Sequence, residues 1–396
     1  MAPPIAARMA DIQPFHVMAL LARARELEAA GRSIVHMEIG EPDFPTAAPI
    51  VAAGHAALAA GQTHYTPAVG LQALREAIAA HYRAGAGARV DTNVDINVDA
   101  ARIVVTPGAS GALHLVLAAL VDPGREVLMS DPGYPCNRNF VRLLEGRAVG
   151  VPTDAAHGYQ LTAELAREHW TERTAALLVA SPANPSGTLL TREQLVELHA
   201  LARERGAALI VDEIYHGLTY GVDAQTALDI ADDIFVINSF SKYYGMTGWR
   251  LGWLVAPHSH VAALDKLAQN LFLAAPTLAQ YAALAAFTPE AQAVFEERRR
   301  IFAERRDYLL PALRELGFDI PVVPQGAFYL YAGCRRFTDD SFAFCRDLLE
   351  QAGVAITPGI DFGAYRAHEH VRFAYTTSIE QLREGVARLS RYLKKR

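Results

Sequence analysis

The chain has 396 residues, of which 51% are hydrophobic and 20% are charged, and its formal net charge is −6 at pH 7. This length exceeds the size at which a single hydrophobic core stops growing, so we expect two domains. The composition is that of an ordinary globular protein and gives no sign of disorder. Positive charge is not gathered into the basic stripe that a phosphate backbone requires, which argues against nucleic-acid binding.

The amino-terminal region is predicted to contain an amphipathic helix and no targeting sequence. Apolar residues 17–22 lead directly into Arg23 and Arg25, whereas a signal peptide has a longer apolar centre. The run at residues 112–121 is interrupted by His114 and is too short to cross a bilayer. The three cysteines are an odd number and lack metal-site spacing. We therefore expect a reduced, cytoplasmic protein without a membrane span or a metal site.

The middle of the chain alternates short β-rich runs with helical patterns. This alternation predicts an α/β fold in three layers, in which helices cover both faces of a mostly parallel central sheet. One helix has clear ends, because Thr191 and Gln194 form a capping-box pattern and Gly206 follows its last apolar residue. The expected strands are residues 103–106, 126–130, 176–180, 208–211, 234–238 and 251–256.

The pattern changes in the last third of the chain. A long charged helix is expected over residues 289–316, followed by short strands and a final helix that starts at Ser378. We expect residues 46–285 to form a large domain, and residues 1–45 and 286–396 to form a smaller one.

Polar residues gather directly after the predicted strands, and open parallel sheets bind ligands outside the carboxyl ends of their strands. The first strand is followed by Gly108, Ala109 and Ser110 at the start of a helix, where free N–H groups favour an anion. This turn lacks the glycine spacing of a dinucleotide fingerprint, and by itself it could be a plain connection. Together with the Ser239 hydroxyl and the Arg250 fork, it fits a phosphate monoester.

Lysine is rare in this chain. Of the four lysines, only Lys242 follows a predicted strand beside the expected phosphate site; the others are Lys266, Lys394 and Lys395. A solvated loop lysine is the ordinary explanation for such a residue, but arginine dominates the basic residues here. A lysine that forms a Schiff base needs its neutral amine, which burial and neighbouring cations promote.

Asp212 follows an apolar run at residues 207–211, and a buried carboxylate is costly unless it is paired. Asp212 could cap the next helix. It could also hold the proton of a pyridinium nitrogen, so that the ring can accept electrons. Tyr215, three residues later, could reach the same ligand.

These residues together resemble the class I and II aminotransferases, which are pyridoxal-phosphate enzymes of fold type I. The resemblance extends from GEPDF at residues 40–44 to RFAY at residues 372–375, and it is most specific in SFSKYYGMTGWR at residues 239–250. It implies an α/β fold with a large cofactor-binding domain and a smaller α+β domain. It also implies pyridoxal 5′-phosphate as the cofactor, and ping-pong transfer of an amino group from an L-amino acid to a 2-oxo acid.

The resemblance further implies roles for individual residues. Lys242 would carry the cofactor as a Schiff base and move the proton, while Asp212 would pair with the ring nitrogen. Asn184 and Tyr215 would bind the ring hydroxyl oxygen. Tyr134, otherwise a turn-packing residue, would stack on the ring. The phosphate would be held by Gly108, Ala109, Ser110, Ser239 and Arg250.

On the substrate side, the resemblance implies that Arg372 binds the α-carboxylate, together with Asn184 and the backbone of Gly40. Without the resemblance, Arg372 could equally be a surface strand residue. Tyr65 is similar to the tyrosine that reaches the phosphate of the neighbouring subunit, which implies a homodimer with shared active sites. The donor side chain stays open. Arg138 is the one candidate cation for a dicarboxylate and could as well lie on the surface; without it, alanine, valine or aromatic donors are possible.

Two other activities compete with transamination. A carbon–sulfur lyase or another eliminating enzyme of the same fold would share nearly all of these residues, because the cofactor supplies the difficult chemistry. Ser239 and Lys242 also satisfy the Ser-x-x-Lys pattern of penicillin-recognising acyl enzymes, although the Lys-Thr-Gly element of those enzymes is absent. A cofactor-binding regulator would need an additional DNA-binding domain, for which the chain has no room.

Overall fold

The computed structural model describes residues 3–12, 14–87 and 98–395. Its strands are β1 Val35–His36, β2 Ile103–Thr106, β3 Glu126–Asp131, β4 Arg147–Pro152, β5 Thr174–Ala180, β6 Ala208–Asp212, β7 Phe235–Ser239, β8 Gly252–Val255, β9 Tyr329–Gly333, β10 Val354–Ala355, β11 Thr357–Pro358 and β12 His370–Ala374. Its α-helices are α1 His16–Ala29, α2 Ala48–Ala59, α3 Gln72–Gly87, α4 Gly108–Leu120, α5 Pro135–Leu143, α6 Ala163–Glu168, α7 Arg192–Glu204, α8 His258–Leu271, α9 Thr277–Ala283, α10 Pro289–Leu316, α11 Ser341–Asp347 and α12 Ile379–Leu393.

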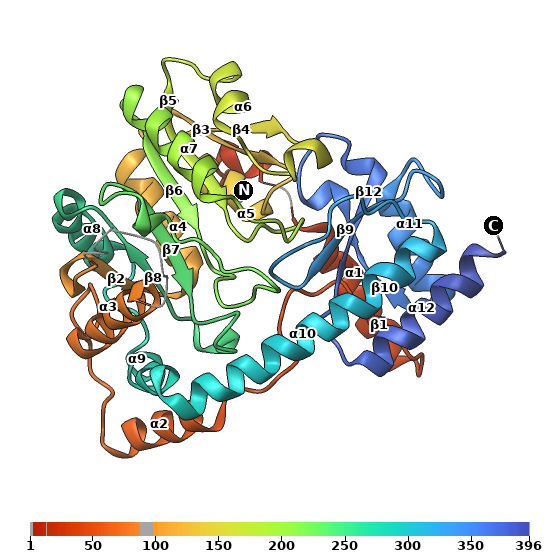
Figure 1. Ribbon diagram of the computed structural model, residues 1–396, viewed down its shortest axis with the longest axis horizontal. Helices are drawn as coiled ribbons and strands as arrows, with labels where there is room; N and C mark the ends of the chain where they lie inside the picture. Colours follow the sequence, from red (N-terminus) through yellow and green to blue (C-terminus); the bar gives the residue numbers. More distant parts are fainter. Residues whose placement is uncertain (1–2, 13, 88–97, 396) are drawn as a thin grey trace.

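A seven-stranded sheet with the order β2-β8-β7-β6-β5-β3-β4 lies at the centre of the larger part of the molecule, on the left in Figure 1. Strands β7, β6, β5, β3 and β4 pair in parallel, whereas β8 is antiparallel to both of its neighbours. The carboxyl ends of β5, β6 and β7 therefore meet at one edge of the sheet, where the chain continues into Ser181, Glu213 and Phe240.

Both faces of this sheet are covered, as the alternation of buried side chains along single strands demonstrates. In β6, Ile210 belongs to one apolar cluster together with α4 and α8, while Leu209 and Val211 belong to another together with α7. Successive side chains of a strand point to opposite faces, so the sheet lies between two helical layers. The predicted three-layer α/β architecture is confirmed.

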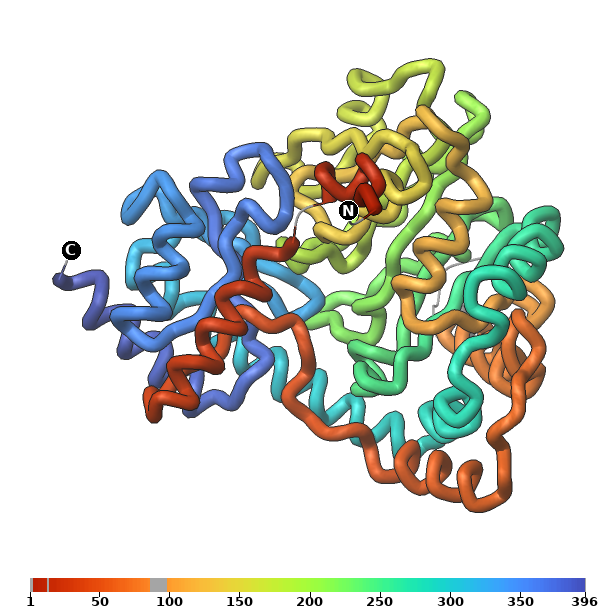
Figure 2. Tube along the Cα trace, turned by 180° about the vertical axis from the view of Figure 1, so that it is seen from behind, coloured from red at the N-terminus to blue at the C-terminus, as the bar shows by residue number. Residues whose placement is uncertain are grey.

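The rest of the chain builds two smaller sheets. One has the order β11-β12-β9, and the other is the short parallel pair of β1 and β10. In this pair Val35 lies opposite Val354, so the segment that follows α1 pairs with a segment of the carboxyl-terminal part of the chain. Figure 2 shows the first helix, in red, running along the blue carboxyl-terminal part.

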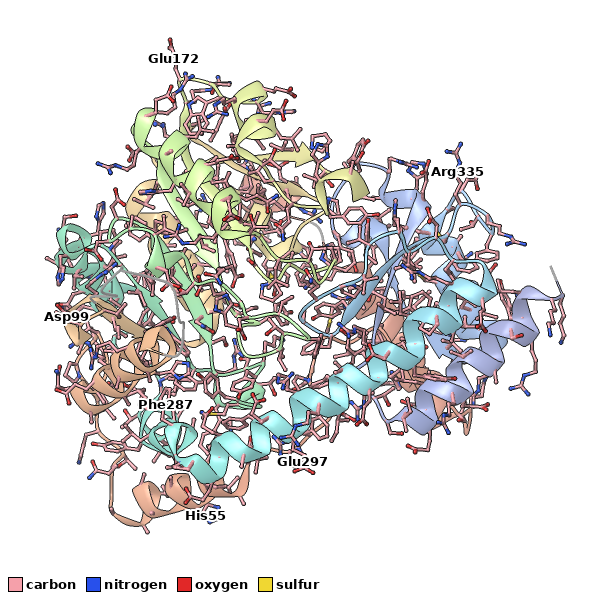
Figure 3. The ribbon with its side chains drawn as sticks, in the orientation of Figure 1. His55, Asp99, Glu172, Phe287, Glu297 and Arg335 are labelled. Carbon is pink, nitrogen blue, oxygen red and sulfur yellow. The ribbon has the colours of Figure 1, made fainter. Side chains whose placement is uncertain are left out.

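Helix α10 connects the two parts of the molecule. It starts near α9 and α2 and continues to α12 (Figure 1). Its inner face buries Phe295, Phe302 and Leu309, whereas Glu297 stands on the outer face (Figure 3). Arg305 on the inner face binds both carboxylate oxygens of Asp43 at 2.7 and 2.8 Å. This ion pair holds the segment around Asp43, just after Gly40, against α10.

All six predicted strands are confirmed to within two residues, and the long helix and the final helix are also confirmed. Ser378 caps α12 by accepting the Gln381 N–H, and Thr191 and Gln194 form the expected capping box on α7. Strand β4 was not predicted, because Gly150 and Pro152 are depleted in strands and β4 lies at the sheet edge. Among the described helices, none combines the length and the hydrophobicity needed to cross a bilayer.

Candidate active site

A cavity of about 860 Å³ lies at the carboxyl ends of β5, β6 and β7. Most of the residues singled out from the sequence line it, although they come from segments far apart in the chain. They are Gly40, Ala109, Ser110, Tyr134, Asn184, Asp212, Tyr215, Ser239, Lys242, Arg250 and Arg372.

Lys242 reaches into this cavity from the turn that follows β7. Its Nζ donates a hydrogen bond to the Gly40 carbonyl at 2.8 Å and lies 6.0 Å from the centre of the Tyr215 ring. Burial lowers the pKa of Lys242 to about 8, with Arg372 and Arg250 acting in the same direction and Glu41 opposing them. The fraction of neutral amine near pH 7–8 is therefore much larger than for an exposed lysine. By contrast, Lys266, Lys394 and Lys395 are exposed.

Asp212 is the last residue of β6, and its side chain is only 3% exposed. Its Oδ1 accepts the Ile214 N–H at 3.1 Å, so the local turn does use this carboxylate. Burial nevertheless raises its pKa to about 7, against the opposing effects of that N–H and of Lys242. A carboxylate held in this way is stabilised by a cationic N–H partner, which is the chemistry a protonated pyridine ring offers.

The start of α4 forms a cradle whose tight geometry fits a phosphate group. Gly108 has a positive φ of 72°, and a Cβ there would lie 2.6 Å from Arg250 Nη2. A Cβ on Gly252 would lie 2.7 Å from the Ala109 nitrogen. Arg250, which is exposed, donates through Nη1 to the Thr247 carbonyl at 3.0 Å. Free helix N–H groups, the nearby Ser239 hydroxyl and a guanidinium fork are the donors that a phosphate monoester takes.

Arg372 lies on β12 and is only 6% exposed, so it is not a surface strand residue. Its Nη1 donates to Asn184 Oδ1 at 2.9 Å, and its Nη2 donates to the Glu38 carbonyl. The guanidinium lies 4.2 Å from the Tyr329 ring centre and 4.8 Å from that of Phe362. These contacts fix the plane of the fork within the cavity, as recognition of a carboxylate requires.

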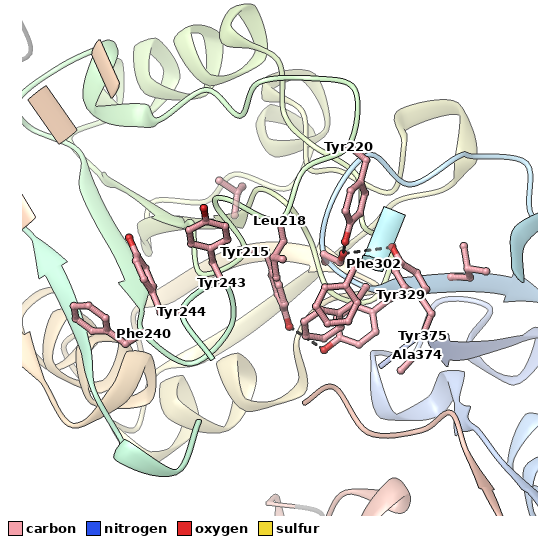
Figure 4. Close-up of a cluster of buried hydrophobic side chains, with 14 of the residues drawn as sticks. Tyr215, Leu218, Tyr220, Phe240, Tyr243, Tyr244, Phe302, Tyr329, Ala374 and Tyr375 are labelled. Carbon is pink, nitrogen blue, oxygen red and sulfur yellow. Dashed lines mark hydrogen bonds between the residues drawn. The ribbon is translucent and has the colours of Figure 1, made fainter. Parts of the chain in front are cut away.

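Three tyrosine side chains also line the cavity, namely Tyr134, Tyr215 and Tyr329. The hydroxyls of Tyr215 and Tyr329 are hydrogen-bonded at 2.9 Å (Figure 4). Gly40 lies so close to Tyr329 that any Cβ at this position would collide with the tyrosine hydroxyl. Tyr134 precedes α5 and is partly buried, and this desolvation raises its pKa. Tyr329 was not singled out from the sequence, because it lies inside a strand and not after one.

The cavity wall contributed by α1 was also not foreseen. Val17, Met18, Leu21 and Arg25 from this helix line the cavity. The helix is anchored by Asp361, whose two carboxylate oxygens accept the His16 and Val17 N–H groups at 2.8 and 2.9 Å. The amphipathic pattern at residues 17–22 signalled a helix, but not that it faces a ligand.

Three residues singled out from the sequence do not line the cavity. Gly108 lies directly behind it, against Arg250. Tyr65 is 82% exposed. Arg138 donates to the Asp361 carbonyl at 2.8 Å and lines neighbouring depressions instead. The cation on the cavity wall that remains without an assigned role is thus Arg25, not Arg138.

The Ser-x-x-Lys alternative is wrong. That pattern requires a serine that opens a helix, whereas Ser239 ends strand β7. Its Oγ accepts the Ser241 N–H at 3.0 Å. In the described part of the chain, no group of three or more His, Cys, Asp or Glu side chains is arranged to hold a metal ion.

The comparison with known sequences agrees with this geometry. Residues 32–389 match the family model of aminotransferase class I and II. A valine–pyruvate aminotransferase of Mycobacterium tuberculosis is 39% identical over 386 residues, covering 97% of each chain. An aspartate aminotransferase of Streptomyces avermitilis is 35% identical and covers 98% of this chain and 96% of its own.

Solved structures show the same similarity. An aminotransferase from Mycobacterium tuberculosis superposes with a TM-score of 0.94 at 38% identity over the whole of both chains. The aspartate aminotransferase of Thermus thermophilus with maleate gives a TM-score of 0.91 at 34% identity, covering 98% of this chain and 100% of its own. The chain therefore belongs to the class I and II aminotransferases, and it is an enzyme that transfers an amino group between an L-amino acid and a 2-oxo acid. This family is generally pyridoxal-phosphate-dependent.

Proposed function

We propose that this aminotransferase holds pyridoxal 5′-phosphate covalently on Lys242 and uses both halves of its cavity for a ping-pong exchange. The observation that carries the proposal is the position of Lys242, a lysine with a lowered pKa between the buried carboxylate of Asp212 and the anion cradle of α4. When bound, the cofactor supplies an electron sink for the Cα–H bond electrons of the substrate.

The side chains of this site have separable tasks. Lys242 Nζ takes the α-proton of the amino acid and returns it, which requires the neutral amine that burial favours. The Asp212 carboxylate keeps a proton on the ring nitrogen. Asn184 and Tyr215 bind the ring hydroxyl oxygen, and Tyr134 covers one face of the ring. The phosphate is held by Gly108, Ala109, Ser110, Ser239 and Arg250.

Arg372 orients the substrate by its α-carboxylate, with Asn184 and the Gly40 backbone beside it. The Arg372 fork is immobilised by buried partners, so the reacting Cα–H bond has a fixed orientation. We propose a neutral amino donor, because Val17, Met18 and Leu21 present apolar groups to the cavity. The name of the valine–pyruvate aminotransferase relative supports the same choice.

We further propose a cytoplasmic homodimer in which Tyr65 of each subunit reaches the phosphate site of the other. The exposure of this large side chain, 82%, supports that role. We also propose that residues 46–285 form a large domain, and that residues 1–45 and 286–396 form a small domain. The β1–β10 pair supports this division, because it joins residues 35–36 to residues 354–355.

The test compares Lys242→Ala with Lys266→Ala, an exposed lysine on α8. We expect the wild type and Lys266→Ala to purify yellow and to lose this colour when a neutral amino donor is added. A 2-oxo acid should restore the colour, and Lys242→Ala should show no turnover. Normal turnover by Lys242→Ala would contradict the proposal. Release of ammonia without a requirement for a 2-oxo acid would identify an eliminating enzyme instead.

A further inference from the structure

Glu38 is a buried acidic residue on the cavity wall, and its carboxylate has no task in the proposed mechanism. The residue is 0% exposed, and its Oε2 atom has no hydrogen-bond partner among the residues that the structure describes. Its backbone carbonyl accepts hydrogen bonds from Arg372 Nη2 at 2.6 Å and from Thr357 Oγ1 at 2.9 Å. The residue that holds the Arg372 guanidinium therefore also brings a carboxylate within one side-chain length of the atom that Arg372 contacts.

His36 provides the counter-charge for this carboxylate. Alternate side chains of an extended segment lie on the same face, so His36 and Glu38 lie together while Met37 enters the core. The Nδ1 atom of His36 lies 2.7 Å from Glu38 Oε1, and its Nε2 atom lies 3.1 Å from Oε1 of Glu28 on α1. Only a doubly protonated imidazole ring donates to both oxygens. The hydrogen bond to Glu38 raises the pKa of His36 to about 9, with Glu28 acting in the same direction and burial opposing them.

The counter-charge matters because the Glu38 segment is fixed in place. The Met37 N–H donates to the Ala355 carbonyl at 2.9 Å, and the Met37 carbonyl accepts the Ala374 N–H at 2.7 Å. The Glu38 carboxylate therefore cannot move away from the site without breaking backbone hydrogen bonds. A buried charge is screened only weakly by solvent and salt. Without its imidazolium partner, Glu38 would oppose the positive charge of Arg372 and repel any anion that approaches it.

We propose that His36 is a positioning residue of the substrate site: its imidazolium neutralises Glu38, so that Arg372 presents an uncompensated positive charge to the α-carboxylates of both the donor and the acceptor. This inference rests on the proposed function, in which Arg372 binds that carboxylate. His36 does not line the cavity, so its effect is exerted through Glu38 and Arg372. Both half-reactions depend on it equally, because both substrates carry an α-carboxylate.

The test compares His36→Gln with His199→Gln in the holoenzyme. A glutamine at position 36 can still donate an N–H to Glu38 but carries no charge. We expect His36→Gln to lower kcat/KM about 10-fold for L-valine and for pyruvate alike. The loss should appear in KM, with kcat within about threefold, because the carboxylate is held equally in the ground state and the transition state. His199 on α7 is paired with Asp233 at 2.6 Å outside the cavity, and His199→Gln should change neither value.

Rescue distinguishes this electrostatic role from a purely structural one. His36→Arg keeps a positive charge beside Glu38 and should retain most of the wild-type kcat/KM. Adding Glu38→Gln to His36→Gln removes the uncompensated charge, so the double variant should recover to the kcat/KM of Glu38→Gln alone. A structural role predicts the reverse, a double variant at least as impaired as His36→Gln. That result, or a loss in kcat at unchanged KM, would overturn the proposal.

Binding provides a second measurement that does not depend on turnover. Calorimetric titration with 3-methylbutanoate, the carbon skeleton of valine without its amino group, should give a dissociation constant about 10-fold higher in His36→Gln than in His199→Gln. Arg372→Lys should also weaken this binding. If Arg372→Lys weakens it and His36→Gln does not, the role of His36 is overturned while the transaminase proposal stands. If Arg372→Lys leaves it unchanged, Arg372 does not bind the α-carboxylate, and the proposed substrate site fails together with this inference.

Discussion

On the side formed by the central sheet, the cavity presents Asn184, Asp212 and Ser239, whose exposed fractions are 7%, 3% and 2%. On the side formed by α1, it presents Met18, which is 55% exposed, and Arg25, which has no hydrogen bond or ion pair to any residue that the structure describes. The first side holds buried polar groups at strand ends, and we propose that these groups bind the cofactor, which is the same in every reaction cycle. The second side is more exposed, and we propose that it contacts the two different substrates. Chemistry and selectivity should therefore respond to mutation separately.

The largest effect should come from Asp212 on the sheet side. Asp212→Asn keeps the size of the side chain but removes the charge that we propose holds the proton on the ring nitrogen of the cofactor. We expect kcat to fall about 10³-fold, a loss in the usual range for a group that controls a proton. The rate of colour loss with a neutral donor measures this step. Asp223→Asn changes an exposed residue outside the cavity and should leave kcat unaffected. An Asp212→Asn variant with normal kcat would show that the buried charge is dispensable.

Arg372 stands between the two sides and should affect every substrate. A lysine cannot reproduce the planar fork that contacts Asn184 and the Glu38 carbonyl. We expect Arg372→Lys to lower kcat/KM roughly 30- to 100-fold for donors and acceptors alike. Steady-state kinetics with one neutral donor and two acceptors would check this. Arg366→Lys, an exposed arginine paired with Glu369, serves as the control. A loss confined to one substrate would refute the shared role of Arg372.

A smaller effect concerns the stability of the cofactor-free protein. Burial raises the Asp212 pKa from 3.8 to about 7, so the folded state binds more protons than the unfolded state between these values. The contribution of Asp212 to stability is therefore present below about pH 4 and is lost as pH rises through 7, with a slope of at most about 1.4 kcal/mol per pH unit. Urea unfolding at pH 5, 6 and 7 should show this loss in the wild type and not in Asp212→Asn. Parallel pH profiles would contradict it.

The smallest effect should come from the apolar wall. Met18→Ala shortens one side chain on the cavity face of α1 without altering any polar group of the sheet side. We expect kcat/KM to fall about 3- to 10-fold for a valine-sized donor and less for alanine, because little apolar contact is lost. Comparison of the two donors measures the difference. Ala19→Ser, on an exposed part of α1 outside the cavity, should change neither value. A reduction in kcat that is equal for both donors would mean that the wall acts on the chemistry.

The sequence predicted the sheet side far better than the α1 side, for a physical reason. Buried parallel strands are short apolar runs, and the chain turns at their ends, so Asn184, Asp212 and Lys242 were recognisable from their position after such runs. Their roles follow from the resemblance and remain predictions. β4 escaped prediction because an edge strand is only partly buried and has a weak pattern.

The substrate side depends on contacts between segments that are distant in sequence. Asp361 binds the start of α1, which is more than 340 residues away in the sequence. The hydroxyls of Tyr329 and Tyr215 are hydrogen-bonded although the two residues are 114 positions apart. No local pattern encodes such a pairing. Arg138 was the candidate cation because it follows Tyr134 closely in sequence. Arg25 lines the cavity because the packing of α1 places it there, and this packing could not be predicted from the sequence.

The anchoring of α1 by Asp361 also bears on how this enzyme can diverge. The carboxylate holds the helix by the main-chain N–H groups of His16 and Val17, which every amino acid except proline provides. The anchor therefore does not depend on which side chains the helix carries. Residues on its cavity face can be exchanged during evolution, and the range of accepted substrates can drift with them, while the helix keeps its place and the strand-end groups keep theirs.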